Sequence, residues 1–123
     1  MSFAVAQYRA TKTVTASPAR VLVQLYDGAL KYLQVGAEAI AERDPKAKGV
    51  ALGKAHRIVC ELQASLDEKQ APELCQQLYG LYDFCLLRIT EANARWDAQA
   101  VKDATKVLET LRSAWTEIAD EMS

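Results

Sequence analysis

One histidine and three cysteines are the residues of this 123-residue chain best suited to reactive chemistry. The cysteines are Cys60, Cys75 and Cys85, so no two of them form the CxxC pair that zinc sites commonly use. An odd number of cysteines is also a poor framework for disulfides. We therefore expect free thiols that pack in the core of a protein kept in a reducing compartment.

The histidine, His56, excludes one chemistry and leaves another open. A di-iron helix bundle needs Glu-x-x-His pairs on two helices, but position 53 is a glycine. A histidine phosphotransfer module is a four-helix bundle with one exposed histidine, and Lys54-Ala55-His56-Arg57 invites that interpretation. Such a module would place a lysine and a glycine where this chain has Val59 and Cys60. We favour a histidine at the edge of an apolar face, and keep phosphotransfer through His56 as the alternative.

The remaining composition offers little to an enzyme. The chain shows no Ser/His/Asp set, no close carboxylate pair and no glycine-rich phosphate loop. Its 15 basic and 16 acidic residues give a net charge of −1, which argues against nucleic-acid binding. It has neither a basic start followed by a long apolar run nor 18 consecutive apolar residues. We expect a cytoplasmic protein that is not an enzyme, does not insert into a membrane and uses no cofactor or metal.

Evenly spaced prolines mark the expected beginnings of three helices. They lie 27 residues apart, at Pro18, Pro45 and Pro72. Ser17 and Asp44 precede the first two, so each can cap a helix whose first residue is proline. Asp97 can cap a fourth helix without a proline. Four helices of similar length follow from this spacing.

Apolar residues recur every three or four positions within each of these segments, which is typical of helices with one buried face. The fourth segment is the clearest, with Val101, Ala104, Leu108, Leu111, Trp115, Ile118 and Met122. The third has Cys75, Leu78, Tyr82, Cys85, Ile89, Ala92 and Trp96. Short connections make neighbouring helices antiparallel. The pattern predicts an all-α protein, an antiparallel up-down four-helix bundle over residues 17–123, preceded by an N-terminal arm of residues 1–16.

The third predicted helix carries more apolar side chains than its inner face needs. That face and its flanks take up Leu74, Leu78, Leu81, Tyr82, Cys85 and Ile89. Phe84 and Leu87 project roughly opposite, near Gly80, where the missing side chain would let another backbone approach. The arm adds the apolar residues Phe3, Val5, Tyr8 and Val14. Either the arm covers this patch, or the patch is a groove for a partner helix with the arm as a removable cover.

An ordered set of short matches over residues 8–117 resembles the FliS family of flagellin-specific export chaperones of bacteria. The matches are Ser17-Pro18, Leu22, Leu25-Tyr26-Asp27-Gly28-Ala29-Leu30, Leu62, Ser65-Leu66-Asp67, Leu78-Tyr79-x-Leu81-Tyr82-Asp83-Phe84, Arg88, Glu91-Ala92-Asn93 and Leu111-Arg112-x-Ala114-Trp115. The arm departs slightly, because it reads Gln7-Tyr8-Arg9 where many relatives have Tyr followed by Gln.

The resemblance implies a cytoplasmic four-helix bundle that binds the C-terminal segment of flagellin, prevents its premature polymerisation and aids its delivery to the flagellar type III export gate. It also implies that the arm can occupy part of the binding surface. We expect client contacts at Gly80, Phe84 and Leu87, with Tyr8 as an anchor in the arm. Leu66 and Val107 are the second expected location. A bundle that forms only a weak homodimer stays open as a further alternative.

Overall fold

The computed structural model describes residues 18–69 and 71–121. They form four helices, α2 (Ala19–Glu42), α3 (Pro45–Ala64), α4 (Pro72–Arg95) and α5 (Ala98–Glu121), and no strand occurs among them. The expected arm, residues 1–16, and the expected cap Ser17 lie outside the described residues.

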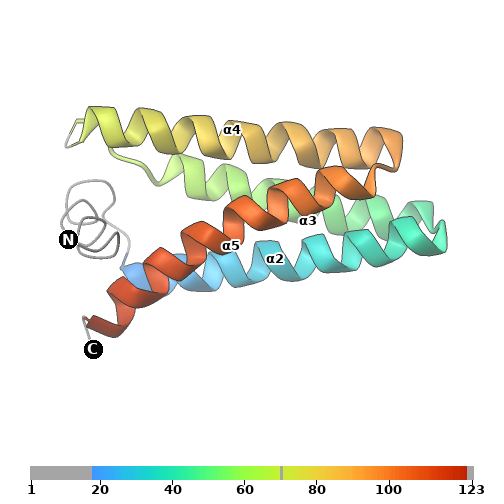
Figure 1. Cartoon of the computed structure of the whole chain (residues 1–123), viewed down its shortest axis with the longest axis horizontal. Coiled ribbons are helices and arrows are strands. Elements are labelled where there is room, and N and C mark those ends of the chain that lie inside the picture. Colours follow the sequence, from blue (N-terminus) through green and yellow to red (C-terminus); the bar gives the residue numbers. More distant parts are fainter. Residues whose placement is uncertain (1–17, 70, 122–123) are drawn as a thin grey trace.

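The helices form a closed ring in which each packs against two others. The packed pairs are α2 with α3, α3 with α4, α4 with α5, and α5 with α2. Figure 1 shows consecutive helices running in opposite directions, with α5 crossing obliquely from the end of α4 towards the beginning of α2. The all-α bundle expected from the sequence is therefore confirmed. Within the described segments, no helix has the length and apolar character needed to span a membrane.

The helix beginnings follow the expected caps in two of three cases. The Asp44 carboxylate accepts the Ala47 amide at 3.1 Å, and the Asp97 carboxylate accepts the Gln99 amide at 2.9 Å. The expectation for the first helix was wrong by one residue. Pro18 is the residue before the helix, with an extended ψ of 143°, and its carbonyl accepts the amides of residues 21 and 22. The first helical residue is therefore Ala19, whose methyl group is buried.

The periodic apolar residues fill the core, as the sequence predicts. The residues of α4 and α5 that were predicted to lie on the inner faces and are buried in the structure are Cys75, Leu78, Tyr82, Cys85, Ile89, Ala92, Val101, Ala104, Leu108, Leu111 and Trp115. The hydroxyls of Tyr26 and Tyr82 meet inside this core at 2.6 Å and join helices on opposite sides of the ring. Their two hydroxyls satisfy each other there, where water cannot.

The end of the bundle that carries the α2–α3 and α4–α5 turns holds a group of residues that the sequence did not predict. Lys48 is only 7% exposed, and its ammonium donates to the carbonyl of Asn93 in the last turn of α4. The same nitrogen lies 4.2 Å from the ring centre of Trp96. The central carbon of the Arg43 guanidinium lies 5.9 Å from the same ring centre. Trp96 was expected on the inner face of α4, but it ends that helix with a positive φ of 56° and is half-buried.

Candidate partner-binding surfaces

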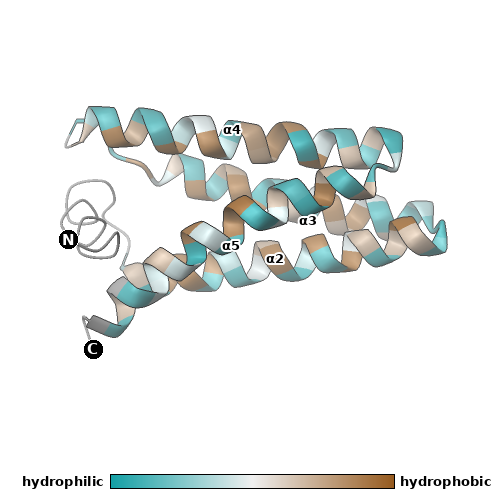
Figure 2. Cartoon of the chain, in the orientation of Figure 1, coloured by the Kyte–Doolittle hydropathy of each residue, from teal (hydrophilic) through white to brown (hydrophobic). Residues whose placement is uncertain are grey.

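The outward face of α4 exposes two large apolar side chains. Phe84 is 40% exposed and Leu87 is 57% exposed, and they are neighbours because residues three apart share a helix face. A Cβ added to Gly80, one turn before Phe84, would meet no atom within 4 Å beyond the nearby backbone of its own helix. Figure 2 shows a hydrophobic stretch in the middle of α4. The exposed positions agree with the sequence prediction, while contact with a client stays a prediction.

Leu81 corrects one detail of that prediction. It was expected to flank the inner face of α4, yet it is 39% exposed. The reason is geometric, since Tyr82 takes the core position and the preceding residue is rotated by about 100° around the helix. Leu81 instead lines a groove of about 240 Å³ between α4 and α5, together with Val107 and Leu111.

The exposed apolar face of α4 and the groove between α4 and α5 adjoin each other, because Leu81 and Phe84 lie three residues apart on α4. We define the α4 surface as the set Gly80, Leu81, Phe84, Leu87 and Val107. Sequence reasoning assigned four of its members to the client and missed Leu81. The signal for Leu81 was its spacing, three residues before Phe84 on a helix already rich in outward apolar groups.

The second expected location does not form one surface. Leu66 follows the end of α3, where it is half-buried and packs against the core. Val107 lies on α5, which faces α3 across the ring instead of packing beside it. Tyr8 lies outside the described residues. The structure therefore places Val107 with Leu81 in the α4–α5 groove, which Leu66 does not line, and client contact at Leu66 or Val107 stays a prediction.

An ion-pair network fixes α4 to α5 beside the α4 surface. The Arg88 guanidinium donates to the Asp103 carboxylate at 2.9 Å and to the Glu91 carboxylate at 2.7 Å. Hydrogen bonds from Gln99 and from Arg88 lower the pKa of Asp103, which keeps its charge over a wider range of pH. The apolar side chains next to Arg88 are thus presented by two helices held in a fixed arrangement.

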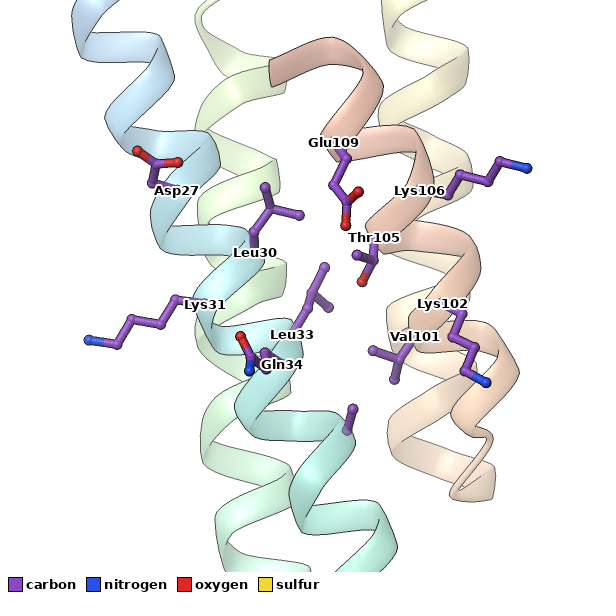
Figure 3. Close-up of a pocket in the computed structure, with 11 residues that line it drawn as sticks. Asp27, Leu30, Lys31, Leu33, Gln34, Val101, Lys102, Thr105, Lys106 and Glu109 are labelled. Atoms are coloured by element: carbon purple, nitrogen blue, oxygen red, sulfur yellow. The ribbon is translucent and has the colours of Figure 1, made fainter. Parts of the chain in front are cut away.

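A larger groove, which the sequence did not predict, lies between α2 and α5. Its volume is about 700 Å³. In Figure 3, Leu30 and Leu33 of α2 and Val101 of α5 point into the space between the helices, whereas Lys31 and Lys106 point away from it. Near one end of this groove, Arg112 forms an ion pair with Asp27 that ties the two helices together. The groove is a second concave surface on the opposite side of α5 from the α4 surface.

His56 lies elsewhere, on the side of α3 that faces α4. It is half-buried and lines a groove of about 390 Å³ with Gly53, Thr90 and Asn93. Its Nδ1 atom is 3.7 Å from the Sγ atom of Cys60. In residues 18–69 and 71–121, no three His, Cys, Asp or Glu side chains gather closely enough to hold a metal ion.

The cysteines are free thiols, as the sequence predicts, but they do not share one environment. Cys75 and Cys85 are fully buried, and burial raises the pKa of the Cys85 thiol to about 12. Cys60 is only half-buried, so the expectation of a core position was wrong for this residue. It follows Val59, which takes the core position, and is therefore rotated away from the core, towards His56.

Comparison with known proteins identifies the relatives of this chain. The family profile described as "Flagellar protein FliS" matches residues 1–122. The flagellar secretion chaperone FliS of Salmonella typhimurium is 35% identical over 111 residues, which cover 89% of this chain and 82% of the relative. The protein of the same name from Vibrio cholerae is 33% identical, covering 86% and 78%. That of Bacillus subtilis is 30% identical, covering 88% and 80%.

A solved structure supports the same fold. The crystal structure of a flagellar chaperone from bacteria superposes with a TM-score of 0.74 over 83% of each chain, at 20% sequence identity. At that identity, the likeness shows a shared arrangement of helices. Membership of a family is shown by the matching profile and by the relatives at 30–35% identity. This chain belongs to the FliS family of flagellar proteins.

Proposed function

We propose that this protein is a cytoplasmic export chaperone that binds the C-terminal segment of flagellin, prevents its premature polymerisation and aids its delivery to the flagellar type III export gate. The support for an export role is that its relatives are named flagellar secretion chaperones, a role that is not enzymatic. The choice of flagellin as client is the one implied by the family resemblance in the sequence.

The exposed α4 surface is the observation that carries the proposal on this chain. A monomeric bundle normally covers its outward faces with polar residues, but here Leu81, Phe84 and Leu87 are each at least 39% exposed on one helix. Contiguous apolar groups of this kind mark sites for other proteins. An amphipathic client helix could bury them, with its own apolar residues spaced three and four apart.

The helix glycine at this surface supports the same conclusion. Glycine inside a helix destabilises it by about 1 kcal/mol relative to alanine. Apart from Gly80, its chain neighbours and the nearby backbone of its own helix, no described atom lies within 4 Å of the place where a Cβ at Gly80 would be. Nothing inside the bundle therefore requires a glycine at this position, whereas the close approach of a client backbone would.

The test is to charge this surface and measure binding. Phe84→Asp should weaken the affinity for a peptide of the flagellin C-terminal segment by about 30-fold or more, because losing an aromatic anchor at the centre of an interface costs about 2 kcal/mol. Val50→Asp is the matched control, since Val50 is 51% exposed and lies on α3, whereas the α4 surface is made by α4 and α5. Isothermal titration calorimetry on both variants, with circular dichroism to verify folding, gives the comparison.

Two outcomes would count against the proposed surface. A folded Phe84→Asp protein that binds with the affinity of the unmodified protein would mean that the client docks elsewhere, with the α2–α5 groove as the next surface to test. A concentration-dependent dimer that flagellin does not dissociate would instead favour the homodimer alternative. Phosphotransfer through His56 is not retained, because the relatives are named chaperones and no observation of the site favours it.

A further inference from the structure

The pair formed by His56 and Cys60 is not used by the proposed function. Both residues lie on α3, on the side that faces α4, and neither belongs to the α4 surface. They are one helical turn apart, and this spacing directs two side chains to the same side of a helix. Imidazole and thiolate are both strong ligands for borderline and soft metal ions.

The distance between the two donor atoms fits a shared metal ion. Zinc binds thiolate sulfur at about 2.3 Å and imidazole nitrogen at about 2.0–2.1 Å, usually in a tetrahedral arrangement. Two such ligands on one tetrahedral ion are therefore separated by about 3.6 Å. The Cys60 Sγ and His56 Nδ1 atoms are 3.7 Å apart. An ion could bind both atoms with the backbone of α3 as it stands.

The surroundings leave room for further ligands. His56 lines the open groove of about 390 Å³ between α3 and α4. Gly53 lies on the same groove, and a Cβ there would meet no atom within 4 Å. Both donor residues are half-buried, so an ion bound to them would remain in reach of solvent. Water or an external donor could complete the coordination, as in metal sites that keep an open position.

We propose that His56 and Cys60 form a two-residue binding site for a borderline or soft metal ion, represented by Zn²⁺. When the ion binds, the Cys60 thiol releases its proton to solvent and its sulfur bonds to the metal, while neutral His56 contributes the lone pair of Nδ1. The sequence did not suggest this site because it lacks a CxxC pair. A His-x-x-x-Cys spacing becomes a candidate only once the His56 Nδ1 and Cys60 Sγ atoms are known to lie 3.7 Å apart.

The experiment is a Zn²⁺ titration of the full chain without an affinity tag, followed by calorimetry. One ion should bind per protein with a dissociation constant on the order of 10 µM, because the protein supplies only two of the four ligands of a structural zinc site. Mg²⁺ should not bind, since it requires oxygen ligands. Cys60→Ala and His56→Gln should each weaken Zn²⁺ binding by about 30-fold or more.

Two further measurements distinguish coordination of the ion by Cys60 and His56 from non-specific electrostatic attraction of a cation to the protein. Co²⁺ in place of Zn²⁺ should give a thiolate-to-metal charge-transfer band that disappears in Cys60→Ala. Glu61→Gln is the matched control, because it removes an exposed carboxylate next to Cys60 in the sequence and should leave both affinity and band unchanged. The melting temperature should rise with Zn²⁺ and not with Mg²⁺, because the folded helix holds the two ligands together.

Three results would overturn the proposal. One is a dissociation constant for Zn²⁺ above about 1 mM, which is weaker than two protein ligands should give. Another is affinity in Cys60→Ala or His56→Gln equal to that of the unmodified protein. The third is the absence of the thiolate band with Co²⁺. None of these results bears on flagellin binding, so the two proposals fail independently.

Discussion

At the scale of single residues, the most informative contact is the hydrogen bond between Tyr26 and Tyr82. Both rings lie in the core with at most 2% exposure, and their hydroxyls are 2.6 Å apart. Burial raises the pKa of Tyr82 to about 12 and that of Tyr26 further above its usual value, so both phenols are neutral at ordinary pH. A buried polar pair of this kind favours one arrangement of helices, because any other arrangement would leave a hydroxyl without a partner.

Replacing both members of this pair should cost less than the two single replacements added together. Tyr26→Phe leaves the Tyr82 hydroxyl buried without its partner, and we expect the free energy of unfolding to fall by about 1–3 kcal/mol. The double variant Tyr26→Phe/Tyr82→Phe should lose less than the sum of the two single variants. Urea denaturation of all four proteins measures this cycle. Additive losses would show that the two hydroxyls do not depend on each other.

The sequence predicts which of these residues are buried, but not what they contact. Tyr26 and Tyr82 fall on periodic apolar faces, so their burial follows from spacing alone. Their hydrogen bond joins residues 56 positions apart, and no local pattern encodes such a distance. Cys60 and Leu81 were assigned incorrectly for a related reason. Each follows or precedes a core residue by one position, and only the packing of the neighbouring helix decides whether that flank is covered.

At the scale of helices, Lys48 connects the beginning of α3 to the end of α4. Its ammonium donates to the Asn93 carbonyl, one of the carbonyls in the last turn of α4, and a cation there is favoured by the helix dipole. The Trp96 ring covers the same ammonium and adds a cation–π interaction. One buried cation therefore holds two helix ends in register.

Removing that cation should destabilise the bundle. Lys48→Met keeps most of the side-chain volume but loses the charged hydrogen bond, so the free energy of unfolding should fall by about 1.5–3 kcal/mol. Lys46→Met is the matched control, because Lys46 is exposed in the first turn of the same helix and its loss should change stability by less than about 0.5 kcal/mol. Equal stability of the two variants in urea would contradict this role for Lys48.

The helices themselves were largely predictable. Asp44 and Asp97 cap helices as their residue types and positions suggest, because a carboxylate at this position satisfies amides that have no partner inside the helix. Pro18 was placed one residue too far inside its helix, since proline is compatible with both positions and the sequence alone does not choose between them. Lys48 was missed because lysine is seldom buried unless a partner elsewhere in the chain satisfies it.

At the scale of the whole molecule, the buried thiol and phenols should make the folded protein less stable at alkaline pH. Cys85 has an ordinary pKa of 9.0 and a raised pKa of about 12 in the folded protein, and Tyr82 rises from 10.0 to about 12. Above about pH 9 the unfolded chain therefore loses protons that the folded chain keeps. The stability from these groups is complete below about pH 9 and is lost as the pH rises towards 12.

This dependence can be measured as the midpoint of urea unfolding at a series of pH values. The midpoint should fall between about pH 9 and pH 12 as Cys85, then Tyr82, ionise in the unfolded chain. Cys85→Ala should start from a lower stability but show a shallower fall just above pH 9, because one of the shifted groups is gone. A stability that is constant from pH 8 to pH 11 would show that these side chains are not buried in solution.

Under the proposed function, this bundle recognises the C-terminal segment of a flagellin. The most direct measurement is size-exclusion chromatography with light scattering on the protein mixed with its cognate flagellin monomer, either full-length or lacking that segment. The full-length flagellin should co-elute as a complex of one copy of each protein, and the truncated flagellin should elute alone. A complex of the same mass with the truncated flagellin would contradict the account, as would the absence of any complex with the full-length protein.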